Sequence, residues 1–265
     1  MKRSVIHIFI VICLIILDVA ALYAQGRQHI IEVEVDGSVR HALVIPPARP
    51  TKGKRSPLVF VFHGRTGTME GAAKRMAIHK HLPNAYAVYP QGLRVEKGRF
   101  DGAGWVMPTQ ADKGRDIALF DTLLDTILTL YDIDRERIYA MGHSNGGGFT
   151  HALWAMRGEH LTAVAASCSG AGHLGEVATR QRPKPAFFVG GKNDKIAPLQ
   201  NVQRCIDRAI ATNRCQRSRN ISPNLVRHVG TNGNDVMVYI HDGGHKFQES
   251  VLPHIARFFS RHKRR

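Results

Sequence analysis

The sequence predicts an α/β protein with a mostly parallel central sheet, helices on both faces and an antiparallel hairpin near the N-terminus. Short apolar runs without polar alternation, such as 57–62, are typical of strands that are buried on both faces. Segments of helical periodicity alternate with these runs and would supply the crossovers that parallel strands need. Asp36 and Gly37 separate two extended runs, 29–35 and 39–45, which is a strong signal for a hairpin turn.

The elements after the hairpin follow one another without a linker or an internal repeat. The predicted strands are 57–62, 86–89, 137–141, 162–166, 186–189 and 236–240. The predicted helices are 69–81, a helix over about 117–128, 146–156, 199–212 and a last helix that turns Val251, Ile255, Phe258 and Phe259 inward. Residues 91–115 and 169–184 are predicted to be long loops. A single domain over residues 25–265 is therefore expected.

Composition supports a globular domain and shows one unusual property, its charge. Of 265 residues, 43% are hydrophobic and 22% are charged, which excludes a mainly disordered, collagen-like or coiled-coil chain. The 37 Lys and Arg exceed the 21 Asp and Glu, so the formal net charge is +16. These cations are scattered, and the only dense run is 261–265. A solvated basic surface is therefore favoured over a nucleic-acid site, which would need clustering on one face.

The N-terminus has the pattern of a secretory signal peptide over residues 1–24. Lys2 and Arg3 precede an apolar run, 5–17, which Asp18 and a stretch of small residues close. A membrane anchor is the alternative, but the run is shorter than the roughly 20 residues that a spanning helix needs. Cleavage after Ala21 and cleavage after Ala24 both satisfy the small-residue rule. The mature chain is expected to be extracellular or periplasmic, without membrane contact.

Three cysteines remain after the signal, which carries Cys13. Cys205 and Cys215 are separated by a predicted helical stretch, which would hold them too far apart for a disulfide. Cys168 could pair with either one, or the thiols could be free and buried. No metal-binding spacing such as CxxC occurs.

The pentapeptide Gly142-His143-Ser144-Asn145-Gly146 follows a predicted strand and opens a predicted helix. A serine nucleophile on a sharp strand-to-helix turn needs glycine two residues before and two residues after it, because any side chain there would clash. The start of the helix adds positive potential beneath the serine. The strand before and the helix after this G-x-S-x-G pattern make a chance glycine-rich turn the weaker interpretation.

A serine nucleophile also needs a base and an orienting acid, which in this arrangement follow it in the order acid, then histidine. Asp194 follows the strand 186–189, and His245 follows the strand 236–240 behind a pair of glycines. Asp242 is the competing acid, but it is too close to His245 in sequence to come from the preceding strand unit. The competing histidines are His143, His151, His173, His228, His241 and His254. The predicted catalytic residues are Ser144, Asp194 and His245.

Two backbone N–H groups are predicted to stabilise the oxyanion. One belongs to Asn145, directly after the nucleophile, and the other to Arg65, in the loop that follows the strand 57–62. A plain turn at the end of that strand is the alternative interpretation of His63 and Gly64.

These motifs together resemble the secreted polyhydroxybutyrate depolymerase and feruloyl esterase family of α/β-hydrolases. The resemblance covers nearly the whole mature chain and rests on the run from Leu58 to Gly64, Trp105, residues 116–120, Ile133-Asp134, Arg137-Ile138-Tyr139, the Ser144 turn, Asp194 and Gly243-Gly244-His245. It implies the α/β-hydrolase fold and a cofactor-free serine carboxylesterase. The implied substrates are small or oligomeric esters, either of hydroxybutyrate polyesters or of phenolic and acetyl groups on plant polysaccharides.

The chain departs from this family around the expected pocket. Relatives usually carry Trp-Pro after the catalytic histidine and a Cys or small residue after the oxyanion His-Gly, where this chain has Lys246-Phe247 and Arg65. The resemblance also implies a disulfide from Cys215 to the following segment, but 216–244 contains no cysteine. Arg65 and Lys246 predict a preference for esters that bear a carboxylate. His63, Trp105 and Lys246 are candidate substrate contacts, and Trp105 could equally be a structural aromatic residue.

Two other functions remain open on the sequence. A different hydrolase of the same fold, such as an oligopeptidase or a dienelactone-type enzyme, would use the same residues. No extra domain is visible for the first, and the predicted signal argues against the second. A non-catalytic basic binding protein is the third hypothesis, but a binder has no need to keep Ser144, Asp194 and His245 together. The number of subunits is not predicted.

Overall fold

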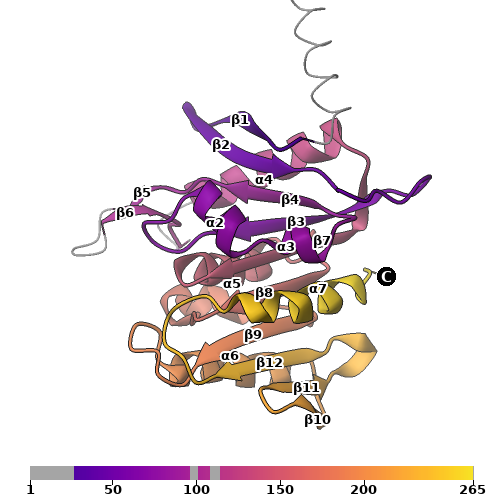
Figure 1. Ribbon diagram of the computed structural model, residues 1–265. Helices are drawn as coiled ribbons and strands as arrows, with labels where there is room; N and C mark the ends of the chain where they lie inside the picture. The colour runs from indigo at the N-terminus through magenta and orange to yellow at the C-terminus, as the bar shows by residue number, and fades with distance from the viewer. Residues whose placement is uncertain (1–26, 96–100, 108–113, 265) are drawn as a thin grey trace, which may run out of the picture.

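The computed structural model describes residues 27–95, 101–107 and 114–264. The predicted signal 1–24 and parts of the loop 91–115 lie outside these residues. Ten strands form one sheet in the order β1-β2-β4-β3-β7-β8-β9-β12-β11-β10 (Figure 1). In chain order these strands are β1 His29–Val35, β2 Ser38–Ile45, β3 Ser56–Phe62, β4 Tyr86–Pro90, β7 Ile133–His143, β8 Ala163–Ser167, β9 Ala186–Gly191, β10 Arg217–Ser222, β11 Leu225–Val229 and β12 Val236–His241.

The six central strands, from β4 to β12 in the sheet order, are parallel to one another, and β4 and β12 pair antiparallel with β2 and β11. Antiparallel hairpins close both ends of the sheet: β1 and β2 at one end, β10 and β11 at the other (Figure 1). The predicted N-terminal hairpin is confirmed. The sequence prediction missed the second hairpin, whose two-residue turn is Pro223-Asn224.

Helices cover both faces, as predicted. The helices are α2 Met69–Arg75, α3 Ile78–His81, α4 Arg115–Leu130, α5 Asn145–Met156, α6 Leu199–Thr212 and α7 Leu252–Ser260, with 3-10 turns at Gly172–Arg180, Thr231–Gly233 and Glu249–Val251. Helices α4, α5 and α6 share one apolar cluster, and α2, α3 and α7 share the other. Successive residues of β3 serve the two clusters in turn: Phe60 packs in the first and Val61 in the second.

Two predictions of local structure need correction. The helix expected over 69–81 is two short helices, because the backbone leaves helical geometry at Met76 and Ala77. The loop expected over 91–115 contains a small hairpin of its own, β5 Leu93–Val95 with β6 Gly102–Gly104. The cysteines Cys168, Cys205 and Cys215 are all free thiols, so the open choice resolves without a disulfide. No helix among the described residues has the length and apolar character to span a bilayer.

Candidate active site

Ser144 lies on the sharp turn between β7 and α5, with φ of 56° and ψ of −119°. Few non-glycine residues adopt this conformation, and holding it costs on the order of 1–3 kcal/mol. A Cβ added at Gly142 would lie 2.2 Å from the carbonyl oxygen of Gly146, and one at Gly146 would lie 2.2 Å from that of Phe62. Both glycines are therefore required by close backbone contacts, which is the physical basis of the G-x-S-x-G pattern.

A chain of hydrogen bonds links Ser144 to His245 and Asp194. The Nε2 atom of His245 lies 2.7 Å from the Ser144 hydroxyl, and its Nδ1 atom lies 2.9 Å from Oδ2 of Asp194. A carboxylate only accepts hydrogen bonds, so Nδ1 carries the proton and Nε2 is free to accept the serine proton. The three residues come from three loops, after β7, β9 and β12, that meet at the carboxyl edge of the sheet.

The environment of Asp194 keeps its carboxyl group ionised. Burial by itself would raise the pKa, but hydrogen bonds from the backbone N–H of Ala197 and from His245, together with the N–H of Ile196, lower it below its ordinary value. The competing acid, Asp242, is exposed and forms an ion pair with Lys192 at 2.7 Å. Of the two acids, only Asp194 contacts His245.

His143 packs beside His245, with 5.1 Å between the ring centroids. Burial, reinforced by the nearby His245, lowers the pKa of His143 to about 4. His143 is therefore neutral at ordinary pH and adds no positive charge next to the base.

The two predicted oxyanion donors lie close to Ser144 in the chain or in space. Asn145 opens α5, where the first N–H groups of a helix have no intrahelical acceptor. Gly64, which precedes Arg65, lies so near that an added Cβ would stand 3.4 Å from Cβ of Ser144. Neither the N–H of Asn145 nor that of Arg65 donates to a protein acceptor within the described chain. Both remain available to a developing oxyanion.

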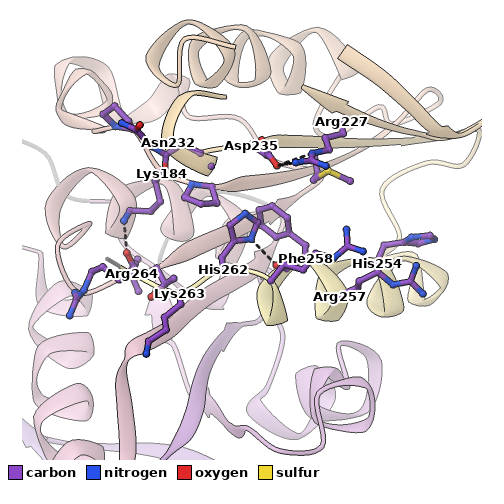
Figure 2. Close-up of a pocket in the computed structure, with 18 of the residues that line it drawn as sticks. Lys184, Arg227, Asn232, Asp235, His254, Arg257, Phe258, His262, Lys263 and Arg264 are labelled. Atoms are coloured by element: carbon purple, nitrogen blue, oxygen red, sulfur yellow. Dashed lines mark hydrogen bonds and ion pairs between the residues drawn. The ribbon is translucent and has the colours of Figure 1, made fainter. Parts of the chain in front are cut away.

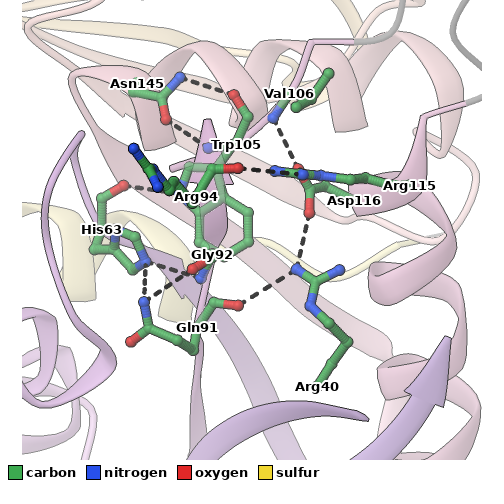
Figure 3. Close-up of polar contacts among 10 residues, drawn as sticks. All are labelled: Arg40, His63, Gln91, Gly92, Arg94, Trp105, Val106, Arg115, Asp116 and Asn145. Atoms are coloured by element: carbon green, nitrogen blue, oxygen red, sulfur yellow. Dashed lines mark hydrogen bonds and ion pairs between the residues drawn. The ribbon is translucent and has the colours of Figure 1, made fainter. Parts of the chain in front are cut away.

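The side chain of Asn145 holds Trp105 at the site through two hydrogen bonds (Figure 3). Its Oδ1 accepts from the Trp105 N–H at 2.6 Å, and its Nδ2 donates to the Trp105 carbonyl at 3.0 Å. The indole N–H donates to the carbonyl of His63 at 2.8 Å, and the ring stacks on Phe149. Trp105 is only 1% exposed, as expected of a structural aromatic residue, and it also lines the cleft. Its role as a substrate contact stays a prediction.

The other two candidate substrate contacts lie outside the lining of the cleft. His63 is buried, its Nδ1 donates to the Gly64 carbonyl at 2.7 Å, and its Nε2 accepts from the N–H of Gly92 at 3.0 Å (Figure 3). Burial lowers the pKa of His63, so the neutral ring supports the loop that carries Arg65. Lys246 is exposed and does not line the cleft. His63 is thus a structural support, because both of its nitrogens are engaged with backbone.

The sequence prediction missed a buried ion pair that lies next to the Trp105 segment. Asp116, fully buried at the start of α4, accepts from Arg40 of β2 at 2.8 Å and from the N–H of Val106 at 2.8 Å (Figure 3). Val106 directly follows Trp105, so its hydrogen bond to Asp116 holds the chain on the C-terminal side of Trp105. Arg40 and Asp116 are 76 residues apart, and no local pattern connects them.

These residues surround a cleft of about 640 Å³. Its lining includes Ser144, His245, Arg65, Trp105 and the α6 residues Arg204 and Arg208. No group of His, Cys, Asp or Glu within residues 27–95, 101–107 and 114–264 is arranged to hold a metal ion. The groups available for chemistry in the cleft are thus the Ser144 hydroxyl, the oriented imidazole of His245 and the unused backbone N–H groups of Arg65 and Asn145.

The chain is similar in sequence and in fold to proteins named as esterases. No protein-family model matches the chain. Feruloyl esterase D of Neurospora crassa is 26% identical over 233 residues, which cover 81% of this chain and 77% of that protein. A probable feruloyl esterase C of Aspergillus niger is 24% identical and covers 71% of this chain and 69% of its own length. The solved structure of an acetyl xylan esterase from Aspergillus awamori superposes with a TM-score of 0.67 at 14% identity, covering 88% of this chain and 99% of that one.

The structural likeness establishes the fold, and the sequence relatives establish the class of enzyme. The chain has the α/β-hydrolase fold, is similar in sequence to feruloyl esterases and is a carboxylic ester hydrolase.

Proposed function

We propose that this protein is a secreted serine carboxylesterase in which Ser144 is the nucleophile, His245 the general base and Asp194 the orienting acid. The observation that carries the proposal is the continuous hydrogen-bonded chain from Asp194 through His245 to the Ser144 hydroxyl, which opens into a cleft. The names of the sequence relatives favour feruloyl esters as substrates, and the name of the structural neighbour adds acetyl esters of xylan. Esters of hydroxybutyrate type are the second substrate class, suggested by the sequence resemblance alone.

In the proposed reaction the Ser144 oxygen attacks the ester carbonyl while its proton passes to Nε2 of His245. The carbonyl oxygen becomes an oxyanion, which the backbone N–H groups of Asn145 and Arg65 stabilise. The tetrahedral intermediate collapses, the bond to the alcohol oxygen breaks, and His245 returns the proton to that oxygen. Water then attacks the acyl-enzyme by the same sequence, which releases the acid and restores the Ser144 hydroxyl.

The test is hydrolysis of p-nitrophenyl acyl esters, methyl ferulate, acetylated xylan and hydroxybutyrate oligomers by the mature chain and by Ser144→Ala. Removing the nucleophile is expected to lower kcat by a factor on the order of 10⁴ to 10⁶. The ranking of the panel identifies the ester class. If Ser144→Ala folds normally and retains the turnover of the parent protein, the proposed function is wrong.

A further inference from the structure

The cleft that contains Ser144 is lined by three arginines. Arg65 comes from the loop after β3, and Arg204 and Arg208 come from α6. Arg204 and Arg208 are four residues apart, so they project from the same face of the helix. Among the described residues, no aspartate or glutamate lines the cleft. Its wall therefore carries three positive charges and no acidic side chain among the described lining residues.

None of these three arginines forms an ion pair within the described part of the chain. Arg65 donates weakly to the Val95 carbonyl at 3.4 Å, and Arg204 donates to the side-chain oxygen of Asn201. The Nη1 atom of Arg208 has no hydrogen-bond partner in the described chain, and neither does the buried hydroxyl of Ser169, which also lines the cleft. Neutral acceptors therefore take up only some of the N–H donors of these arginines, and no carboxylate among the described residues pairs with their charges.

Arginines elsewhere in the protein are used differently. Several of them are held by carboxylates at short distances, for example Arg157 by Asp121 and Arg137 by Asp134. A guanidinium stays charged in proteins, so three unpaired ones in a cleft repel one another and pay a desolvation cost. Burial and the nearby Arg115 lower the pKa of Arg65, which reflects this cost. A bound anion would offset both the repulsion between the guanidinium groups and the cost of their desolvation.

We propose that the ester substrate carries a carboxylate, in its acyl or its alcohol part, which Arg204 and Arg208 bind while Ser144 attacks the carbonyl. Ser169 would supply a neutral donor beside them, and Arg65 would add positive potential from the other wall. Guanidinium groups bind carboxylates through paired hydrogen bonds, and a narrow cleft concentrates the attraction. The inference rests on the proposed function, and it replaces the expected role of Lys246, which lies outside the cleft lining.

The experiment compares pairs of esters that differ only in charge. Mono-p-nitrophenyl adipate and p-nitrophenyl hexanoate have acyl chains of equal length that end in a carboxylate or a methyl group. The pair 4-acetoxybenzoate and 4-acetoxybenzamide places the charge on the alcohol side. For each pair the measured quantity is the ratio of kcat/KM for the anionic ester to that for the neutral ester, so intrinsic reactivity cancels between protein variants.

In Arg204→Gln and in Arg208→Gln the ratio is expected to fall roughly tenfold for at least one pair, mainly through a higher KM for the anionic ester. Arg208→Lys should restore part of the ratio, because it keeps the charge and loses the planar fork. Arg219→Gln, which removes an exposed cation from β10, should leave the ratio unchanged. Added salt should lower the ratio of the parent protein.

A parent protein without preference for the anionic member of either pair would overturn the inference, as would an unchanged ratio in both α6 variants. Arg204 is exposed, so its substitution keeps the test valid if Arg208→Gln fails to fold. Ser144→Ala, assayed on the neutral hexanoate, tests the proposed function separately. If Ser144→Ala loses turnover of the hexanoate while the parent protein shows equal kcat/KM for the anionic and neutral esters, the carboxylate site is refuted and the proposed esterase function stands.

Discussion

Two basic clefts lie at opposite ends of the parallel strands. The one with Ser144 is at the carboxyl ends of the parallel strands, and a larger groove of about 970 Å³ lies at their amino ends, beside α7 (Figure 2). Segments just before β8, β9 and β12 line this groove, together with the C-terminal residues from His254 to Arg264. The groove is larger and richer in cations than the catalytic cleft, so size and charge alone would select the wrong one.

The difference lies in what the cations contact. In the groove Arg227 pairs with Asp235 at 2.6 Å (Figure 2). Lys263 pairs with Glu136 at 2.7 Å, and Lys184 donates to the carbonyl of Leu161. In the catalytic cleft none of the arginines has an acidic partner among the described residues. Four of the six Lys and Arg side chains that line the groove are bonded to other parts of the chain, namely Lys184, Arg227, Lys263 and Arg264. The three arginines of the cleft have no carboxylate partner among the described residues and keep hydrogen-bonding capacity for a ligand. The position of each cleft relative to Ser144, together with the acidic partners of its cations, therefore distinguishes the two sites better than size or charge does.

The largest expected effect is on catalysis, and it distinguishes Asp194, which contacts His245 of the cleft, from Asp235 of the groove. Asp194→Asn should lower kcat by roughly 10⁴-fold, because an amide no longer holds His245 in the tautomer that accepts the serine proton. Asp235→Asn, the matched change in the groove, should leave kcat unchanged and lower the free energy of unfolding by about 1–3 kcal/mol, since it weakens the contact with Arg227. Steady-state kinetics and urea unfolding measure the two. Equal effects on kcat would remove the distinction between the clefts.

A second prediction concerns the buried support of the catalytic edge. Arg40→Met removes the nearer cation of the fully buried Asp116, leaves only Arg115 at 3.4 Å, and should reduce the free energy of unfolding by up to about 3–5 kcal/mol. The double variant Arg40→Met with Asp116→Leu should recover part of that loss, because no unpaired charge remains, although the Val106 N–H then loses its acceptor. Denaturant unfolding of the two variants checks the prediction. A double variant less stable than the single one would contradict it.

The smallest effect is a pH dependence in the groove. Burial, aided by repulsion from Arg264, lowers the pKa of Lys184 to about 8 from its ordinary 10.5. Between these values the unfolded chain binds more protons than the folded chain, so this residue makes stability increase as pH rises from about 8 to about 10.5. The gain is on the order of 2–3 kcal/mol at most.

Lys184→Met should abolish that gain. The informative measurement is the difference in unfolding free energy between the parent and Lys184→Met at pH 7.5 and at pH 10, because titration of tyrosines and thiols cancels in it. A difference that stays constant over this interval would show that Lys184 titrates normally in the folded protein.

The accuracy of the sequence prediction followed the range of the interactions. The Ser144 turn was recognisable because close backbone contacts restrict Gly142 and Gly146 to glycine within five residues. The order of nucleophile, acid and histidine follows from the topology of a parallel sheet, and it selected Asp194 over Asp242. Catalytic roles remain predictions, but the structure brings Ser144, Asp194 and His245 into one chain of hydrogen bonds.

Features that depend on distant segments were not recognisable in this way. The pair of Arg40 and Asp116 joins a strand to a helix far along the chain, and hydropathy carries no trace of it. The arginines of α6 are two among 37 cations, and only the fold shows which of them lie near Ser144. The missed hairpin of β10 and β11 did leave a signal, since Pro223-Asn224 is a common turn pair between two extended runs.

The two anchors of Trp105 have a consequence for enzyme engineering. The Asn145 amide clamps the backbone of Trp105 on both sides, and Asp116 holds the next residue, Val106. Because these contacts fix the segment locally, the flanking chain can be exchanged or lengthened in a library without displacing the wall next to the nucleophile. Sequence variation for new ester specificities therefore belongs in the chain that flanks these anchors, with Gly92, Trp105 and Val106 kept.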